Sequence, residues 1–322
     1  QLAASRQQYE NWIARMRSAG FNTIRLYTLH FPRFYEALAD YNQNHPQEPM
    51  LLFQGIWLEE TLPGYDHDLY FLRDTFQHHI RETVNCVHGN AIVPQRVGKA
   101  YGNFTADVSP WLMGYIIGRE VHPVEIITTN EQNPEVQSFS GEAFSLPSGS
   151  PAEAWVTGQL DFLVRHERES YGQQRPVSFS SWPTLDPLRH PSENSSEDIA
   201  ELDFAKIETI DAPAGLFVSY HAYPYYPDFI SKDSAYQYTS DYEGQNSYIA
   251  YLQDLKAHFG PKPVIIAEYG TASSWGVAHH AQSGIHHGGF DEKTQGRYFI
   301  RMLHNIETAN CGGGMLFAWI DE

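Results

Sequence analysis

The chain has 322 residues, 42% of them hydrophobic, which is enough to bury a large core in one α/β barrel or in two smaller domains. Its formal charge of −18 argues against nucleic acid and anionic membrane surfaces as partners and favours a neutral ligand. No apolar run approaches the roughly 20 residues that cross a bilayer, so we expect no membrane insertion in this segment.

Strand and helix patterns alternate through the first part of the chain. Helices are indicated by apolar residues at three- and four-residue spacing, and strands by short continuous apolar runs. The predicted elements are, in order, helix 7–19, strand 21–27, helix 31–41, strand 50–57, helix 66–87 and the strand within 111–121. Alternation of this kind predicts a parallel sheet.

Long polar segments interrupt the second part. The segment 125–151 has no period and is rich in Asn, Gln, Ser, Gly and Pro, so it is predicted to be a long loop. The segments 181–213 and 271–290 are further predicted insertions. The remaining predicted elements are helix 152–171, strands 176–180 and 215–220, helix 247–259, strand 263–270, helix 291–309 and strand 313–319.

Two of the apolar strands each end in a single glutamate. Glu268 lies near the carboxyl end of the stretch Pro263–Gly270, and Glu120 lies near the carboxyl end of the stretch Trp111–Val121. The carboxyl ends of parallel strands are where such sheets place their chemistry. One glutamate at a strand end is ordinarily a salt-bridge partner, but two at matching strand ends favour a functional pair.

Seven strands can be counted, whereas a closed barrel needs eight. If the eighth lies before residue 1, then Glu120 and Glu268 end strands four and seven. The sequence therefore predicts an α/β fold, a single-domain (β/α)8 TIM barrel over residues 1–322 that lacks strand one and the last helix in this segment. Further domains of a longer chain are compatible with this prediction.

With these positions assigned, the chain resembles the clan A retaining glycoside hydrolases, most nearly the cellulase and mannanase type of barrel of glycoside hydrolase family five. The resemblance covers the whole chain as architecture. Beyond the two glutamates it depends on Arg25 in Ile-Arg-Leu-Tyr, His221-Ala-Tyr223 after strand six, Glu268-Tyr-Gly on strand seven and Trp319 on strand eight.

The resemblance implies a role for several of these residues. In that clan the acid/base glutamate ends strand four and the nucleophile ends strand seven, so Glu120 and Glu268 would take these roles. Arg25 and Tyr223 would be neighbours of the nucleophile, and Trp319 would form a stacking floor for the sugar. The clan usually has Asn before the acid/base, where it holds the sugar 2-hydroxyl, whereas this chain has Arg119. The resemblance therefore does not assign the identity of the sugar.

The chemistry is also predicted from the residues alone. Splitting an acetal needs one protonated carboxyl and one ionised carboxyl, and a separation of about 5 to 5.5 Å permits a covalent sugar intermediate. We expect a retaining β-glycosidase that hydrolyses a glycan or oligosaccharide by double displacement, without metal or cofactor. Two alternatives stay open: a transglycosylase of the same chemistry, and a non-catalytic carbohydrate-binding barrel, which Arg119 and the apparent lack of strand one and the last helix make plausible.

Further candidates for contact with a carbohydrate lie on the rim segments. Aromatic faces suit the C–H faces of sugar rings, and the substrate-binding candidates are Arg25, Trp57, Arg119, Trp182, His221, Tyr223, Trp275 and Trp319. Four histidines in 271–290 could suggest zinc, but a flexible Gly- and His-rich loop is better explained as a lid or sugar-contacting rim. Cys86 and Cys311 are expected to be free thiols. A glycan-degrading role would favour an extracytoplasmic location, which the sequence itself does not assign.

Overall fold

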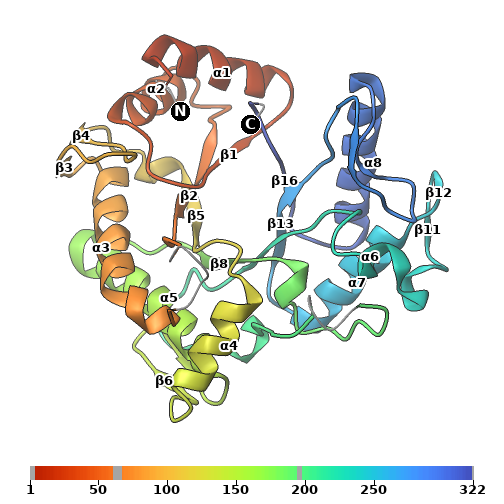
Figure 1. Cartoon of the computed structure of the whole chain (residues 1–322). Coiled ribbons are helices and arrows are strands. Elements are labelled where there is room, and N and C mark those ends of the chain that lie inside the picture. The colour runs from red at the N-terminus through yellow and green to blue at the C-terminus, as the bar shows by residue number, and fades with distance from the viewer. Residues whose placement is uncertain (1–3, 61–66, 194–197, 321–322) are drawn as a thin grey trace.

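Seven parallel strands follow one another around a nearly closed barrel (Figure 1). The computed structural model describes residues 4–60, 67–193 and 198–320. The barrel strands in these ranges are β1 (Thr23–Leu26), β2 (Leu51–Ile56), β5 (Leu112–Ile117), β8 (Val177–Ser181), β10 (Val218–His221), β13 (Val264–Tyr269) and β16 (Gly314–Leu316). Their order in the sheet is their order in the chain, which is the winding of a (β/α)8 TIM barrel, so the predicted fold class is confirmed.

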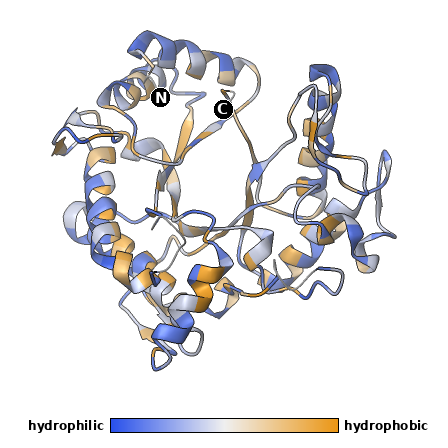
Figure 2. Cartoon of the chain, in the orientation of Figure 1, coloured by the Kyte–Doolittle hydropathy of each residue, from blue (hydrophilic) through white to orange (hydrophobic). Residues whose placement is uncertain are grey.

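Helices connect the strands and cover the outside of the sheet. They are α1 (Arg6–Ser18), α2 (Pro32–Asn44), α3 (Leu69–Val87), α4 (Pro123–Gln132), α5 (Pro151–Tyr171), α6 (Phe229–Lys232), α7 (Ser247–Phe259) and α8 (Glu292–Thr308). Capping boxes begin three of them, at Ser5 with Gln8, at His122 with Glu125 and at Ser150 with Glu153. In Figure 2 the outward side of α3 is mainly hydrophilic, as expected for a helix that buries one face.

The apolar core has two layers. A small inner cluster inside the barrel is formed by Phe53, Ile116, Phe217 and Ala267. A much larger outer layer lies between the strands and the helices. Some other inward-pointing side chains are polar, and Arg25 among them contacts Ser180 and His221 nearer the carboxyl ends of the strands.

One predicted loop contains a helix. The segment 125–151 was expected to be irregular, but α4 begins at Pro123 and continues to Gln132. Its first turn is capped by His122, whose ring accepts from the Val124 amide, while the Glu125 side chain accepts from the His122 amide. The prediction was wrong because polar side chains make the cap here and the apolar spacing is weak.

Short antiparallel strand pairs lie in the connections between the barrel strands and helices. They are β3 (Ala91–Val93) with β4 (Gly102–Phe104), β6 (Phe139–Ser140) with β7 (Phe144–Leu146), β7 with β9 (Glu208–Thr209), β11 (Ser240–Asp241) with β12 (Gly244–Gln245), and β14 (Val277–His279) with β15 (His287–Gly288). Both cysteines are free thiols, as predicted. Among the described helices, none combines the length and apolarity needed to cross a membrane.

Candidate active site

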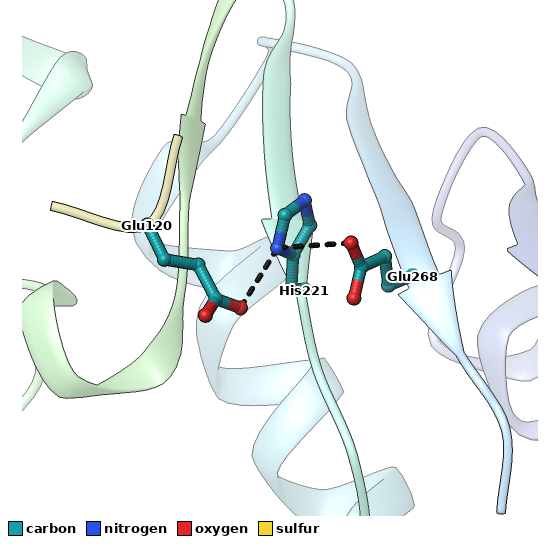
Figure 3. A group of neighbouring side chains, drawn as sticks. All are labelled: Glu120, His221 and Glu268. Carbon is teal, nitrogen blue, oxygen red and sulfur yellow. Dashed lines mark hydrogen bonds and ion pairs between the residues drawn. The ribbon is translucent and has the colours of Figure 1, made fainter. Parts of the chain in front are cut away.

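Two glutamates and a histidine meet at the carboxyl ends of three strands. Glu120 lies three residues beyond the end of β5, His221 ends β10, and Glu268 is the last residue but one of β13. Figure 3 shows the imidazole between the two carboxylates. Gly118 gives the chain its direction after β5: its φ is +87°, and a Cβ there would lie 2.5 Å from the Phe179 ring.

An irregular ladder aims the Glu268 side chain into the mouth of the barrel. Ile266 packs in the outer layer and Ala267 inside the barrel, so simple alternation would turn Glu268 outward. Between β10 and β13, however, the register shifts after Tyr220, and His221 pairs with Glu268. Irregularities of this kind re-aim side chains next to functional sites, which explains the inward direction of the carboxylate.

Two phenols fix the Glu268 carboxylate, one on each oxygen. The Tyr27 hydroxyl donates to Oε1 and the Tyr223 hydroxyl donates to Oε2, both at 2.6 Å. Burial and the neighbouring carboxylate raise the pKa of both tyrosines far above the ordinary value, so the phenols stay protonated donors. The guanidinium of Arg25 lies 3.8 Å from Oε1 and adds a compensating charge.

The imidazole of His221 is oriented by Arg25. Its Nε2 lies 2.8 Å from Nη1 of Arg25, a group that can only donate, so Nε2 accepts and the hydrogen resides on Nδ1. Nδ1 lies 2.8 Å from Oε1 of Glu120 and 3.3 Å from Oε1 of Glu268. Burial lowers the pKa of His221 to about 3, so the ring is neutral and donates one N–H toward both carboxylates.

Arg25 is sealed beneath the site. Only 6% of its side chain is exposed, and it also donates to the carbonyl of Ala267 at 2.8 Å and to Oγ of Ser180 at 3.0 Å. Its guanidinium therefore contacts the imidazole and lies near Glu268 without facing solvent. A substrate entering from the mouth would meet the carboxylates first.

Glu120 is the more accessible of the two acids. Its side chain is 40% exposed, against 10% for Glu268. Loss of hydration raises the pKa of Glu120 to about 7, and the charge of Arg25 opposes this effect. Glu120 is thus a carboxyl group that holds a proton near neutral pH at the open side of the pair, as an acid catalyst needs.

The three side chains also have the spacing of a metal site. Ligand atoms of Glu120, His221 and Glu268 all lie within 4.8 Å of one another, the one such group among the described residues. A metal at Nδ1 would require the hydrogen on Nε2, where it would face an N–H of Arg25 at 2.8 Å. The donor set therefore fits a shared proton better than a metal ion.

Arg119 forms a buried ion pair with Glu125. Its Nη1 and Nη2 lie 2.9 Å and 2.8 Å from the two oxygens of Glu125, which lies in the first turn of α4, and its Nε donates to the carbonyl of Leu58. Only 2% of the side chain is exposed. These contacts give Arg119 a structural task, and its predicted contact with substrate is not among them.

The predicted aromatic residues lie at different distances from the strand ends. Trp57 directly follows β2, Trp182 directly follows β8, and Trp319 lies three residues after β16. Trp275 lies in the connection between β13 and β16 and is fully exposed. Their contact with a carbohydrate remains a prediction.

Tyr27 is a site residue that the sequence reasoning missed. It was assigned only to the end of the strand 21–27. A usable signal was present, because Arg25 and Tyr27 are two residues apart and therefore share one face of the strand. Ser180, which ends the predicted strand 176–180, was also missed as a site residue.

Comparisons with known proteins bear on the fold. No protein-family profile matches the chain. No curated protein matches it by sequence. Among solved structures, an endo-laminarinase from Formosa Hel1_33_131 has a TM-score of 0.52 and 12% identity over 100% of this chain and 74% of its own.

Two other solved structures are similar at lower scores. A β-glucuronidase from Bacteroides uniformis has a TM-score of 0.49 and 14% identity over 99% of this chain, which spans only 28% of that protein. The β-glucanase SdGluc5_26A from Saccharophagus degradans has a TM-score of 0.47 and 12% identity over 98% of this chain and 75% of its own. Of the three, the endo-laminarinase is the one that bears on the argument, and at 12% identity it supports the barrel fold alone.

Proposed function

We propose that the protein is a retaining β-glycosidase that hydrolyses a glycan or oligosaccharide. The observation that carries the proposal is the pair Glu120 and Glu268, whose nearest oxygens are within 4.8 Å and share the N–H of His221. Retaining enzymes hold their carboxyl groups about 5 to 5.5 Å apart, whereas inverting enzymes need about 6.5 to 9.5 Å to admit a water. The names of the structures with similar folds agree with chemistry at a glycosidic bond.

In the first step Glu268 attacks the anomeric carbon. One of its oxygens forms a bond to that carbon while the bond from the carbon to the leaving oxygen breaks, and the electron pair stays on the leaving oxygen. The proton of Glu120 is transferred to this oxygen. The pKa of about 7 keeps that proton available up to neutral pH.

In the second step water releases the sugar. Glu120, now a carboxylate, takes a proton from water as the water oxygen bonds to the anomeric carbon and the bond to Glu268 breaks. Tyr27 and Tyr223 receive the returning carboxylate charge through the two hydrogen bonds that already fit it. Both acids are then restored, and the product keeps its β configuration.

The test begins with a panel of aryl β-glycosides and β-linked polysaccharides. The Glu268→Gln variant should lose hydrolysis by at least about a thousandfold with an unchanged fold, and a 2-deoxy-2-fluoro glycoside should label Glu268 in the parent enzyme. Unchanged turnover in this variant would end the nucleophile assignment.

The acid/base role has its own test. The Glu120→Ala variant should keep activity on aryl glycosides with good leaving groups, because these need little protonation, and azide should accelerate it by replacing the base-assisted water. The product should then be a β-glycosyl azide. A folded variant that azide does not accelerate contradicts the role.

The alternatives receive no separate support. A transglycosylase would pass the sugar to a second sugar, and analysis of products at high acceptor concentration distinguishes it from a hydrolase. Arg119 was one of two arguments for the binding-only barrel, and its pairing with Glu125 weakens that argument.

A further inference from the structure

The phenol on Oε2 of Glu268 is supported by a second aromatic ring. Tyr223 donates to that oxygen at 2.6 Å, and its ring packs against Tyr225, with centroids 5.3 Å apart and planes at 31°. The two tyrosines flank Pro224 in the connection after β10, where Tyr223 pairs with Tyr226 across a tight turn. The place of the Tyr223 phenol therefore depends in part on what Tyr225 packs against.

Tyr225 is a buried neutral ring close to both acids. Only 7% of the residue is exposed. Burial raises the pKa of its hydroxyl above the ordinary value, and the charges of Glu268 and Glu120 add to this effect. Because buried side chains pack with little free space, a ring in this position passes on the place of its neighbour.

That neighbour is His287, which belongs to a distant hairpin. Its ring stacks on Tyr225, with centroids 4.7 Å apart and planes at 7°. His287 begins β15 and lies opposite His279 of β14, so both side chains project from the same face of the hairpin. His279 contacts the same connection after β10: its Nε2 lies 2.7 Å from Oδ1 of Asp228, and its ring meets Tyr226 edge to face at 5.7 Å.

The backbone beside His287 is fixed separately. Oγ1 of Thr271 donates to the carbonyl of His286 at 2.6 Å, and the side chain of Gln295 in α8 donates to the carbonyl of Thr271 at 2.9 Å. These two bonds connect the hairpin to the end of β13 and to the helix that follows. The His287 ring is thus held from behind while it stacks on Tyr225.

We propose that His287 is a positioning residue of the reaction: it holds Tyr225, and through it Tyr223, so that the Tyr223 hydroxyl stays on Oε2 of Glu268. This inference rests on the proposed function. Release of the sugar returns negative charge to Glu268, and a phenol already in place stabilises that charge without reorganisation. His287 acts through two other rings, so its role requires no contact with the substrate.

The first experiment measures kcat and KM on the 4-nitrophenyl β-glycoside that the substrate panel identifies. His287→Ala should lower kcat about three- to tenfold and leave KM within about twofold, because the released carboxylate is stabilised less while substrate contacts are kept. His287→Phe keeps a stacking ring and should stay within about twofold of the parent enzyme. Unchanged kcat in His287→Ala, or an equal loss in His287→Phe, overturns the proposal.

Two controls address folding. His304, a 57% exposed histidine of α8, provides the matched change, and His304→Ala should behave as the parent enzyme does. Circular dichroism checks that each variant is folded. If His287→Ala does not fold, His287→Leu replaces it, since leucine fills much of the space without a flat ring; the same loss and the same recovery by His287→Phe are then expected.

A double-mutant cycle tests the path through Tyr223. In the Tyr223→Phe background the hydroxyl is absent, so His287→Ala should cost less than about a further twofold in kcat. Losses that multiply would show that His287 acts independently of Tyr223 and would overturn the proposal. His279→Ala removes the neighbouring contact with Asp228 and should cost less than His287→Ala; an equal loss would assign the support to the hairpin as a whole and contradict a specific role of His287.

Failure of this inference differs from failure of the proposed function. If Glu268→Gln still hydrolyses the nitrophenyl glycoside, the proposed function has failed. If Glu268→Gln is inactive and His287→Ala matches the parent enzyme, only the inference about His287 has failed.

Discussion

At the scale of single residues, the site is organised by one N–H that faces two acids. The sequence allowed prediction of Glu120, Glu268, Arg25, His221 and Tyr223 as neighbours at one end of a barrel, and the structure brings these five together. It did not allow prediction of the imidazole's direction, because that direction depends on a guanidinium 196 positions away in the chain.

The two phenols on Glu268 allow a matched pair of variants. Tyr27→Phe removes the donor to Oε1, and Tyr223→Phe removes the donor to Oε2. Each should lower kcat by about 10- to 1000-fold with little change in KM, because the released carboxylate is stabilised less. Kinetics on an aryl glycoside check this, and circular dichroism controls for folding. A change in KM alone would assign Tyr27 to substrate binding instead.

The proton on Glu120 predicts an alkaline limit to activity. A general acid works only while protonated, and the pKa of Glu120 is raised to about 7, so kcat/KM should decline as pH rises through about 7. The pH profile of the parent enzyme measures this. In Glu120→Ala, the remaining activity on good leaving groups should lack that limb; a profile of unchanged shape would assign the ionisation to another group.

At the scale of elements, α4 and the end of β13 show where sequence patterns fail. The helix α4 is anchored by the ion pair of Arg119 with Glu125 and by the ring of His122, polar contacts that an apolar period does not reveal. The inward aim of Glu268 depends on a register shift against β10, which is a property of two strands together. Strand ends were predictable within a few residues, whereas pairing details were not.

The ion pair that anchors α4 should be costly to break. Arg119→Met leaves the fully buried Glu125 without its partner, which should lower the free energy of unfolding by about 3 to 5 kcal/mol. Urea denaturation measures this loss. The double variant Arg119→Met with Glu125→Leu should recover part of it, since no buried charge remains. Full stability of the single variant would contradict a structural role for the pair.

At the scale of the whole molecule, the alternation of strands and helices predicted the winding of the barrel. Parallel strands need long crossovers, so seven apolar runs separated by helices or long loops leave few other arrangements. The structure confirms the order β1-β2-β5-β8-β10-β13-β16. Loop interiors were less predictable, because hairpins such as β14 with β15 are too short to leave a pattern.

Buried neutral histidines should make the molecule sensitive to acid. Burial lowers the pKa of His221 to about 3 and that of His30 to about 4, while an unfolded histidine titrates near 6.5. The unfolded state therefore binds more protons in this window, and stability falls as pH drops below about 6.5. Glu120 has the opposite sign, since its raised pKa makes the folded state bind a proton first.

The acid effect is best measured in a Glu120→Gln background. Between pH 7 and pH 5 the free energy of unfolding should fall by about 2 kcal/mol for each of the two histidines. Replacing His30 with Gln should remove about half of that fall, as measured by urea denaturation at the two pH values. A stability that is flat over this range would contradict the neutral, buried state of both rings.

The hydrogen bond from Arg25 to Nε2 of His221 has a consequence for which side chains position 25 can accept. A glutamine at position 25 could present its carbonyl oxygen to the ring and draw the hydrogen to Nε2. Nδ1 of His221 would then present a lone pair, and not a hydrogen, to Glu120 and Glu268. The two carboxyl groups would lose the N–H that now lies between them. Arg25, whose side chain is 6% exposed, thereby fixes which ring nitrogen of His221 donates toward the two glutamates.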